Sequence, residues 1–369
     1  MCNFLLRKGN AVWNLVDNLG LTAADLAWSL NAADVYELLQ AEGVRAEMIR
    51  AALEAAAELN GQSDDEDDEM DQADAEMDEA DAEEKEAEAG AAEVPAAAAD
   101  DEPKLSTASD NATFLASKII YRVDERGQEI AEDAEGNGVM MGWERPIMEQ
   151  TARRLCEAYE WRRTATARTK GGALKRDDAP EPEKGEDDDE DDDEELVVVN
   201  FGFGLGIIDS YLQEYHPTTH LIIEPHPDVL AHAKETGWFA KPGVRFFEGT
   251  WQDYLQALED EREPYLCFDA VYFDTYSEHY KDLRAFFDVL PNWLRSDASR
   301  FSFFHGLGAT SRCFYDVYTT VSELHLRDMG LLTEWEEVDL DNAWVWDGLE
   351  KRYWGDVGPY RLPVSRLEM

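Results

Sequence analysis

The sequence predicts an α/β fold with a doubly wound parallel sheet. Four short apolar segments, rich in β-branched and aromatic residues, are typical of buried strands: 196–200, 221–224, 268–274 and 301–304. Segments with helical spacing of their apolar residues separate these strands: 207–215, 227–235, 251–258 and 281–294. Strands and helices in alternation form a parallel sheet covered by helices, and ligands bind such sheets at the carboxyl ends of the strands.

The charge of the chain is concentrated in two tracts. The 369 residues carry a formal charge of −49. Residues 64–102 contain 20 acidic residues and one lysine, and residues 177–195 contain 14 acidic residues and one lysine. Direct binding to nucleic acid or to an anionic membrane needs clustered Lys and Arg, so this charge argues against both. No apolar run approaches the roughly 20 residues of a membrane span.

The composition divides the chain into three parts. Residues 1–60 are helix-rich and resemble an ankyrin repeat preceded by the tail of another, with Thr22 as a helix cap. Residues 61–112 have too few apolar side chains to fold and are predicted to be a disordered acidic linker. Residues 113–369 form the main domain, interrupted by a charged disordered insertion at 164–195.

The role of the N-terminal part has two interpretations. Ankyrin-like repeats bury their apolar faces only by stacking, and about three are usually needed for stability. Here there are about one and a half, so this part either packs on the rest of the protein or is cut short. It is a protein-docking surface or a small helical cap.

A glycine-rich turn directly follows the first predicted strand. Its sequence is Gly202-Phe203-Gly204-Leu205-Gly206-Ile207. Glycines at this turn let the backbone approach a ligand closely. Glu224 ends the next strand about 20 residues later, where a carboxylate holds ribose hydroxyls. The combination predicts an adenosine-containing ligand, either a dinucleotide or S-adenosylmethionine, and the G-x-G-x-G spacing favours the latter.

Three further segments carry a family resemblance: Val-Met-Met-Gly-Trp-Glu-Arg-Pro-Ile-Met at 139–148, Gly-Thr-Trp-Gln-Asp at 249–253 and Phe-Asp-Thr-Tyr at 273–276. Together with the glycine turn, they resemble guanidinoacetate methyltransferase and its relatives, the fungal protein arginine N5-methyltransferases. The ankyrin-like N-terminus is similar to the arginine N5-methyltransferase branch. The resemblance implies a Rossmann-like class I methyltransferase fold with S-adenosyl-L-methionine as cofactor and no metal.

The resemblance also implies the residues of the cofactor site. The cofactor would lie on Gly202, Phe203, Gly204, Leu205, Gly206 and Ile207, with its ribose on Glu224. Its adenine would lie near Pro225, His226, Thr250 and Trp251. Met140 and Met148 would flank the sulfonium, Asp274 would close the site, and Tyr121 aligns loosely with an aromatic contact. Asn200 stands where many methyltransferases place an acid.

Glu144 and Asp274 are the candidate catalytic pair. A guanidinium is a planar cation that pairs with carboxylates through two parallel hydrogen bonds. Two carboxylates from opposite sides of a pocket would fix its plane and hold it beside a sulfonium cation. Because the reacting nitrogen must lose a proton, one carboxylate would also accept it.

The resemblance implies a protein substrate with an accessible arginine, of the basic ribosomal type, and modification of the δ (N5) nitrogen. We expect a monomer located in the cytoplasm and nucleus. Two alternatives stay open at this point. One is a methyltransferase for a small guanidino compound. The other is a non-enzymatic binding protein or chaperone for basic partners.

Overall fold

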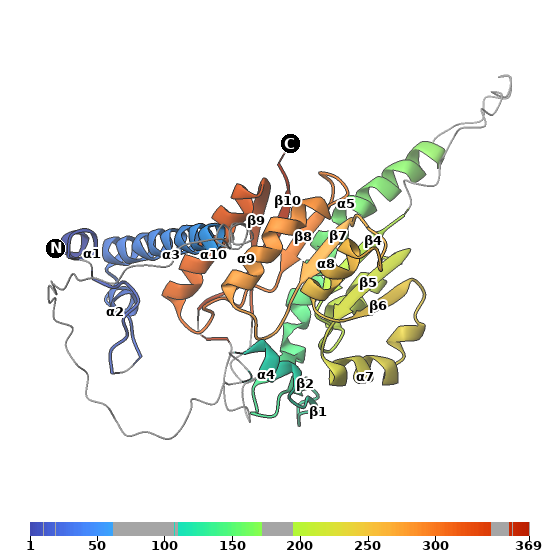
Figure 1. The fold of residues 1–369 in the computed structure, drawn as a ribbon, viewed down its shortest axis with the longest axis horizontal. Coiled ribbons are helices and arrows are strands. Elements are labelled where there is room, and N and C mark those ends of the chain that lie inside the picture. Colours follow the sequence, from blue (N-terminus) through green and yellow to red (C-terminus); the bar gives the residue numbers. More distant parts are fainter. Residues whose placement is uncertain are drawn as a thin grey trace, which may run out of the picture.

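The computed structural model describes residues 1–9, 11–18, 20–61, 107, 110–171, 195–340, 354–355 and 357–368. Most of the stretch assigned to the acidic linker, and residues 172–194 of the assigned insertion, lie outside these described residues. Helix α5, Arg145–Gly171, extends into the range assigned to the insertion, so the helical backbone continues further than the composition indicates. Figure 1 shows N-terminal helices, a small sheet and a large helix-covered sheet.

A seven-stranded sheet forms the centre of the fold, in the order β6-β5-β4-β7-β8-β10-β9. The strands are β4 (Val197–Phe201), β5 (Thr219–Glu224), β6 (Val244–Glu248), β7 (Ala270–Phe273), β8 (Arg300–Phe303), β9 (Leu331–Val338) and β10 (Tyr360–Leu367). Strands β6, β5, β4, β7 and β8 are parallel, whereas β10 is antiparallel to both β8 and β9. The predicted doubly wound α/β fold is confirmed, because the chain continues from β4 to β5 on one side and later returns to β7 on the other.

Helices cover both faces of this sheet (Figure 1). Helices α5, α6 (Ile207–Gln213) and α7 (Pro227–Glu235) lie on one face, and α8 (Trp251–Glu259), α9 (Tyr280–Val289) and α10 (Arg312–Asp328) lie on the other. Alternate residues of a strand point to opposite faces. Val199 accordingly packs with α8 and α9, and Val198 packs with α5 and α6. Short 3-10 helices occur at η1 (Gly142–Glu144), η3 (Trp238–Ala240) and η4 (Leu290–Asn292).

A small antiparallel sheet and a short helix precede the large sheet in the chain. The small sheet consists of β1 (Ile120–Val123), β2 (Glu129–Glu132) and β3 (Gly138–Met141), and helix α4 (Asn111–Leu115) lies before it. Phe114 of α4 and Ala131 of β2 pack into one core with Ile222 of β5. The small sheet is therefore fixed against the large one, and β3 leads directly through η1 into α5.

The N-terminal helices pack on the main domain. They are α1 (Cys2–Arg7), α2 (Ala23–Ser29) and α3 (Ala33–Gly61). Thr22 forms the predicted cap, since its side chain accepts the Asp25 N–H while the Asp25 carboxylate accepts the Thr22 N–H at 2.8 Å. A shared core joins these helices to Cys313, Val317 and Val321 of α10. The expected packing of this part on the rest of the protein is therefore observed.

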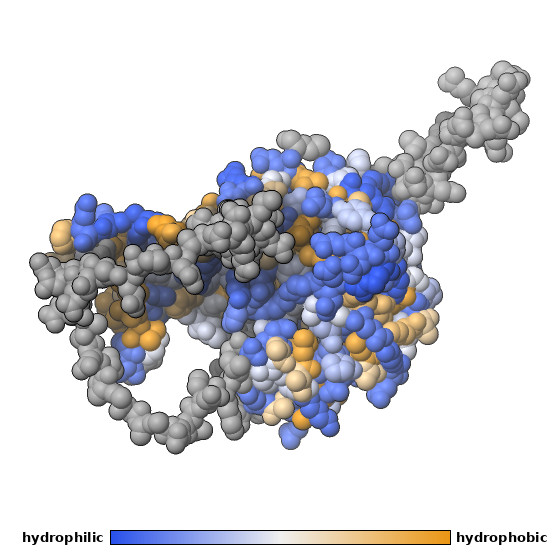
Figure 2. Space-filling model, viewed as in Figure 1, coloured by the Kyte–Doolittle hydropathy of each residue, from blue (hydrophilic) through white to orange (hydrophobic). Residues whose placement is uncertain are grey.

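The N-terminal part of the chain also exposes many apolar side chains. Twelve exposed large hydrophobic residues of the described chain lie within the first 53 residues, among them Leu15, Trp28 and Leu30. Figure 2 shows orange surface over this part of the molecule, at the left of the view.

Gly43 of α3 lies close against Val317 of α10. A Cβ atom at this position would lie 2.7 Å from Val317 Cγ2 and 3.0 Å from the Trp13 ring. We expect Gly43→Val to lower the free energy of unfolding by about 1–3 kcal/mol through overpacking. The measurement is urea denaturation, with Ala52→Val at an exposed position of the same helix as the control. Equal midpoints for the two variants would contradict this close packing.

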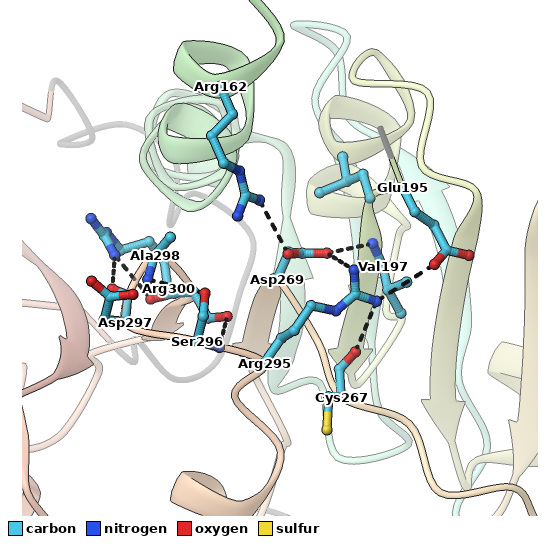
Figure 3. A network of polar contacts seen from close by, with 12 residues as sticks. Arg162, Glu195, Val197, Cys267, Asp269, Arg295, Ser296, Asp297, Ala298 and Arg300 are labelled. Atoms are coloured by element: carbon cyan, nitrogen blue, oxygen red, sulfur yellow. Dashed lines mark hydrogen bonds and ion pairs between the residues drawn. The ribbon is translucent and has the colours of Figure 1, made fainter. Parts of the chain in front are cut away.

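A polar network closes the amino-terminal edge of the large sheet (Figure 3). The buried Asp269 carboxylate accepts the Val197 N–H at 3.0 Å. It also pairs with Arg162 of α5 at 3.3 Å and with Arg295 at 3.2 Å. The network ties α5 and the segment before β8 to the ends of β4 and β7, at the edge opposite the one where parallel sheets bind ligands.

No helix in the described part of the chain has both the length and the apolar character needed to cross a membrane. Within the same described ranges, no group of three or more His, Cys, Asp or Glu side chains is arranged to hold a metal ion.

Candidate active site

A cavity of about 200 Å³ lies at the carboxyl ends of the parallel strands. The cavity opens beside β4. The chain continues from β4 to β5 on one side of this strand and later to β7 on the other, and doubly wound sheets bind their ligands at such a reversal of strand order. The lining residues are Asn111, Phe114, Leu115, Gly138, Val139, Met140, Glu144, Phe201, Gly202, Gly204, Ile223, Glu224, Pro225, Val229, Thr250, Trp251, Asp274, Thr275, Tyr276, Ser277, Glu278, Phe304 and Gly306.

The glycine turn after β4 lines this cavity through Gly202 and Gly204. Gly202 has φ +93°, and a Cβ atom there would lie 2.1 Å from the Asp274 carbonyl oxygen. Gly204 has φ +55°, and a Cβ atom there would lie 2.7 Å from Met140 Sδ. At Gly202 only glycine fits both the backbone angle and the space, whereas at Gly204 a Cβ atom would displace the end of the Met140 side chain. The turn is thus a close-packed cradle of backbone, as the sequence predicts.

A buried hydrogen-bond network supports the turn from beneath. Asn200 Nδ2 donates to the Gly202 carbonyl oxygen at 2.7 Å and to Asp209 Oδ2 at 2.9 Å. The Asp209 carboxylate in turn contacts His220 Nε2 at 2.9 Å. Neither Asn200 nor Asp209 lines the cavity. Asn200, at the position where many methyltransferases carry an acid, therefore holds the glycine turn in place through its side-chain amide.

Glu224 ends β5 and lines the cavity next to the glycine turn. Its Oε2 accepts the Phe203 N–H at 2.8 Å, and its Oε1 accepts the His226 N–H at 2.7 Å. Burial raises the pKa of Glu224 to about 7, against the opposite effect of these backbone hydrogen bonds. Each carboxylate oxygen has a second lone pair, so the group can also accept hydroxyl donors from a ligand.

The titration of Glu224 predicts a pH dependence of cofactor binding. Because its pKa is raised, the carboxylate is protonated below about pH 7 and loses its charge as a hydroxyl acceptor. If the ionised form binds, the affinity for the expected cofactor, S-adenosylmethionine, falls by about tenfold from pH 8 to pH 6. Calorimetry at both pH values measures this. Glu224→Gln should bind more weakly at both, with little pH dependence, and an equally steep profile for this variant would assign the titration to another group.

Glu144 and Asp274 face the cavity from two different elements. Glu144 is buried at the end of η1, and its Oε1 accepts the Met141 N–H at 2.9 Å. Asp274 directly follows β7, and its N–H donates to the Phe201 carbonyl at 2.9 Å. Asp274 Oδ2 is buried and has no hydrogen-bond partner among the described residues. Burial raises the pKa of Asp274 well above its usual range, and the nearby charge of Glu144 raises it further.

Trp251 and Thr250 line the cavity at the start of α8. Thr250 caps the helix by accepting the Asp253 N–H at 3.0 Å. The Trp251 indole N–H donates to Glu278 Oε1 at 3.1 Å, and Thr275 Oγ1 donates to Glu278 Oε2 at 2.6 Å. Glu278 therefore fixes the tryptophan ring and the loop after β7 with respect to each other. Glu278 is not among the residues expected from the sequence, although its position four residues after Asp274 is a signal for it.

Outside the glycine turn, three of the expected cofactor contacts do not line the cavity. Tyr121 stacks on His232, with ring centroids 3.8 Å apart. Met148 is fully buried, and its sulfur accepts the Tyr272 hydroxyl at 3.3 Å. The His226 ring is turned toward the Phe114 carbonyl oxygen at 3.2 Å, although its backbone N–H supports Glu224. These three side chains hold neighbouring elements together.

The remaining residues of the glycine turn act through their backbone. The Phe203 ring is buried in a core with Trp238, while its N–H reaches Glu224. The Leu205 N–H donates to Met140 Sδ at 3.2 Å. Gly206 and Ile207 are the cap and first residue of α6, and neither lines the cavity. The cavity thus contains Gly202, Gly204, Glu224, Pro225, Thr250, Trp251, Met140, Glu144 and Asp274 of the predicted set.

Comparison with known proteins extends across the whole chain. A family model described as guanidinoacetate N-methyltransferase matches residues 194–301. Protein arginine N-methyltransferase 2 of Cryptococcus neoformans is 33% identical, over 100% of this chain and 82% of its own length. The protein of the same name from Neurospora crassa is 38% identical, over 96% of this chain and 78% of its own. The chain belongs to the fungal protein arginine N-methyltransferase 2 family.

Membership of the protein arginine N-methyltransferase 2 family confirms the resemblance seen in the sequence. The Aspergillus oryzae member is 35% identical over 98% of this chain and 76% of its own length. Among solved structures, precorrin-6y C5,15-methyltransferase from Geobacter metallireducens is similar over 47% of this chain and 81% of its own, with 18% identity and a TM-score of 0.34. The range matched by the family model includes the glycine turn, Glu224 and Asp274, whereas Glu144 lies before it.

Proposed function

We propose that the protein is an S-adenosylmethionine-dependent methyltransferase that monomethylates the δ (N5) nitrogen of arginine in a polypeptide. The observation that carries this proposal is that Glu144 and Asp274 line the same cavity as the glycine turn and Glu224. A guanidinium needs two carboxylates and a nucleoside needs the turn and the acid, so one cavity suits both reactants.

The residues present fit S-adenosylmethionine. Gly202 and Gly204 leave no room for side chains of their own, which keeps the backbone beside the cavity open to a ligand. Glu224 would accept ribose hydroxyls, and Pro225 and Trp251 would enclose the adenine. When bound, the cofactor supplies a methyl group on a positively charged sulfur. Met140 lies against Gly204 and would border this end of the ligand.

Glu144 and Asp274 would hold the terminal nitrogens of the arginine guanidinium. The Asp274 oxygen without a partner would gain a donor in this complex, which removes the penalty of a buried unpaired acceptor. Holding both terminal nitrogens leaves the internal nitrogen as the one that can face the methyl group. Positioning two reactants in this way supplies much of the rate acceleration.

Atoms and charge balance in this transfer. The lone pair of N5 forms the new N–C bond, and the electron pair of the broken C–S bond stays on sulfur. One proton leaves the nitrogen, and we assign Asp274 as its acceptor, because its raised pKa makes it a better base than an ordinary aspartate. The products are a methylated guanidinium, a neutral thioether and one proton.

The charge of the cavity favours a polypeptide substrate over a small guanidino acid. Four acids line the cavity, namely Glu144, Glu224, Asp274 and Glu278, whereas no Lys, Arg or His of the described residues lines it. The carboxylate of guanidinoacetate would enter this negative field without a cation to pair with. An arginine within a polypeptide carries no such carboxylate. We propose accordingly that the substrate is a basic protein of the ribosomal type. We also propose that the enzyme is a monomer and that it acts in the cytoplasm and nucleus.

The test is incubation with methyl-labelled cofactor and a basic-protein extract, followed by mass spectrometry of the labelled band. The expected result is monomethylarginine in a polypeptide. Guanidinoacetate in a parallel reaction should be a poor acceptor. Preferred turnover of guanidinoacetate would support the small-molecule enzyme that the matching family model describes. Absence of cofactor binding by calorimetry would support the non-enzymatic binding protein.

A further inference from the structure

A second groove of about 200 Å³ opens beside Asp274. We call this part of the cavity, where the proposed methyl transfer takes place, the reacting end. The groove shares Asp274, Thr275, Glu278, Phe304 and Gly306 with the cavity lining. The residues that belong to the groove alone are Phe273, His279, Leu283, Phe303 and Leu307. They come from β7, the start of α9, β8 and the loop between β8 and α10. The groove therefore leads away from Asp274, past Gly306, toward the face of the sheet that α9 covers.

We propose that this groove holds the polypeptide segment on one side of the target arginine. The inference rests on the proposed function and names how a polypeptide, as opposed to a free guanidino compound, is recognised. The internal nitrogen is bonded to the aliphatic stem of arginine. When the carboxylates hold the two terminal nitrogens, the stem must leave the reacting end in another direction, and the groove provides an opening directly beside Asp274.

The chemistry of the groove fits a basic or apolar neighbour of the arginine. Leu283, Leu307 and Phe303 supply apolar contacts. Glu278 and Asp274 supply negative charge, His279 is the basic side chain of the lining, and no Lys or Arg of the described residues lines the groove. An acidic residue next to the arginine would be repelled, because the two carboxylates outnumber the single histidine of this lining. The occupant is thus an arginine-containing segment whose flanking residue is uncharged or basic.

One test uses the unmodified protein and short arginine peptides. The peptides differ at a single position, either just before or just after the arginine, which carries Leu, Lys or Glu. We expect Glu on one side only to lower kcat/KM by about tenfold relative to Leu at low salt, with a smaller difference at high salt. Equal values for Leu and Glu on both sides would overturn the proposal.

A second test blocks the groove. Leu307→Trp adds an indole at its lining, and Leu53→Trp adds the same ring at an exposed position of α3. We expect Leu307→Trp to raise KM for the Leu peptide by about tenfold while the affinity for S-adenosylmethionine stays within about twofold. Ethylguanidine has the substituted nitrogen without a polypeptide, and its turnover should change far less. The Leu53→Trp control should match the unmodified protein in all three measurements.

The outcomes separate this inference from the proposed function. If the unmodified protein methylates the peptides, but neither the flanking Glu nor Leu307→Trp changes the kinetics, the groove has no such role and the proposed function stands. If no peptide arginine is methylated while cofactor binds, the proposed function itself fails. If Leu307→Trp does not fold, the peptide series still decides, because it needs no variant.

Discussion

Asp274→Asn is expected to lower kcat for methyl transfer to an arginine polypeptide by about 100-fold or more. The amide has nearly the shape of the carboxylate but neither the charge that pairs with a guanidinium nor the capacity to accept the proton. Because burial and Glu144 both raise the pKa of Asp274, replacing it removes the group best suited as base. The measurement is steady-state transfer of labelled methyl, with cofactor affinity determined in parallel by calorimetry.

Glu278→Gln is a matched control for this prediction, since it makes the same chemical change in the same cavity. The Glu278 oxygens already accept hydrogen bonds from Trp251 and Thr275. We therefore expect a smaller loss of kcat, accompanied by weaker cofactor binding. Glu144→Gln should resemble Asp274→Asn. Unchanged transfer by both Asp274→Asn and Glu144→Gln, with cofactor bound normally, would show that the pair does not hold the substrate.

Gly202→Ala is expected to weaken S-adenosylmethionine binding by about 100-fold, the equivalent of roughly 3 kcal/mol. Two effects contribute. An alanine at φ +93° is strained, and its Cβ atom would meet the Asp274 carbonyl oxygen at 2.1 Å. Both strands of the site must shift to relieve this contact, so the turn and Asp274 move together. Calorimetric titration with the cofactor measures the change.

Gly127→Ala separates the two effects. Gly127 has a similar φ of +84°, but a Cβ atom there would meet nothing within 4 Å. This substitution should cost a little folding stability and leave cofactor affinity within about twofold, because strain alone is small and distant from the cavity. If both alanine variants bind the cofactor equally well, the close packing of Gly202 against Asp274 has no part in binding.

The elements around the glycine turn are the ones that sequence patterns predict well. Strands buried on both faces are short and continuously apolar, so β4, β5, β7 and β8 are recognisable in the sequence. Strand β6 lies at the edge of the sheet and carries Arg245 and Glu248 among its residues, which conceals it. The small sheet β1-β2-β3 is also hidden, because Arg122, Glu129 and Glu132 interrupt the apolar residues of β1 and β2.

The residues of the candidate site also fall into two groups, those that can be placed from the sequence and those that cannot. Residues that directly follow parallel strands, such as Gly202, Glu224 and Asp274, can be placed from the sequence because those strand ends meet at one edge. Asn111 and Phe114 of α4 line the same cavity, but they are distant in the chain and no periodicity connects them to it. Met148 shows the converse. It belongs to a recognisable segment, yet its helical position directs the side chain into the core.

The most direct test of the central claim, that Glu144 and Asp274 hold arginine with its internal nitrogen toward the methyl group, is fragmentation mass spectrometry of a methylated peptide. Cleavage between the internal nitrogen and the guanidinium carbon separates the two possible locations of the methyl group. The account predicts that the methyl stays with the fragment that keeps the aliphatic stem, and that Asp274→Asn abolishes this product. A methyl on the released terminal nitrogens would contradict it.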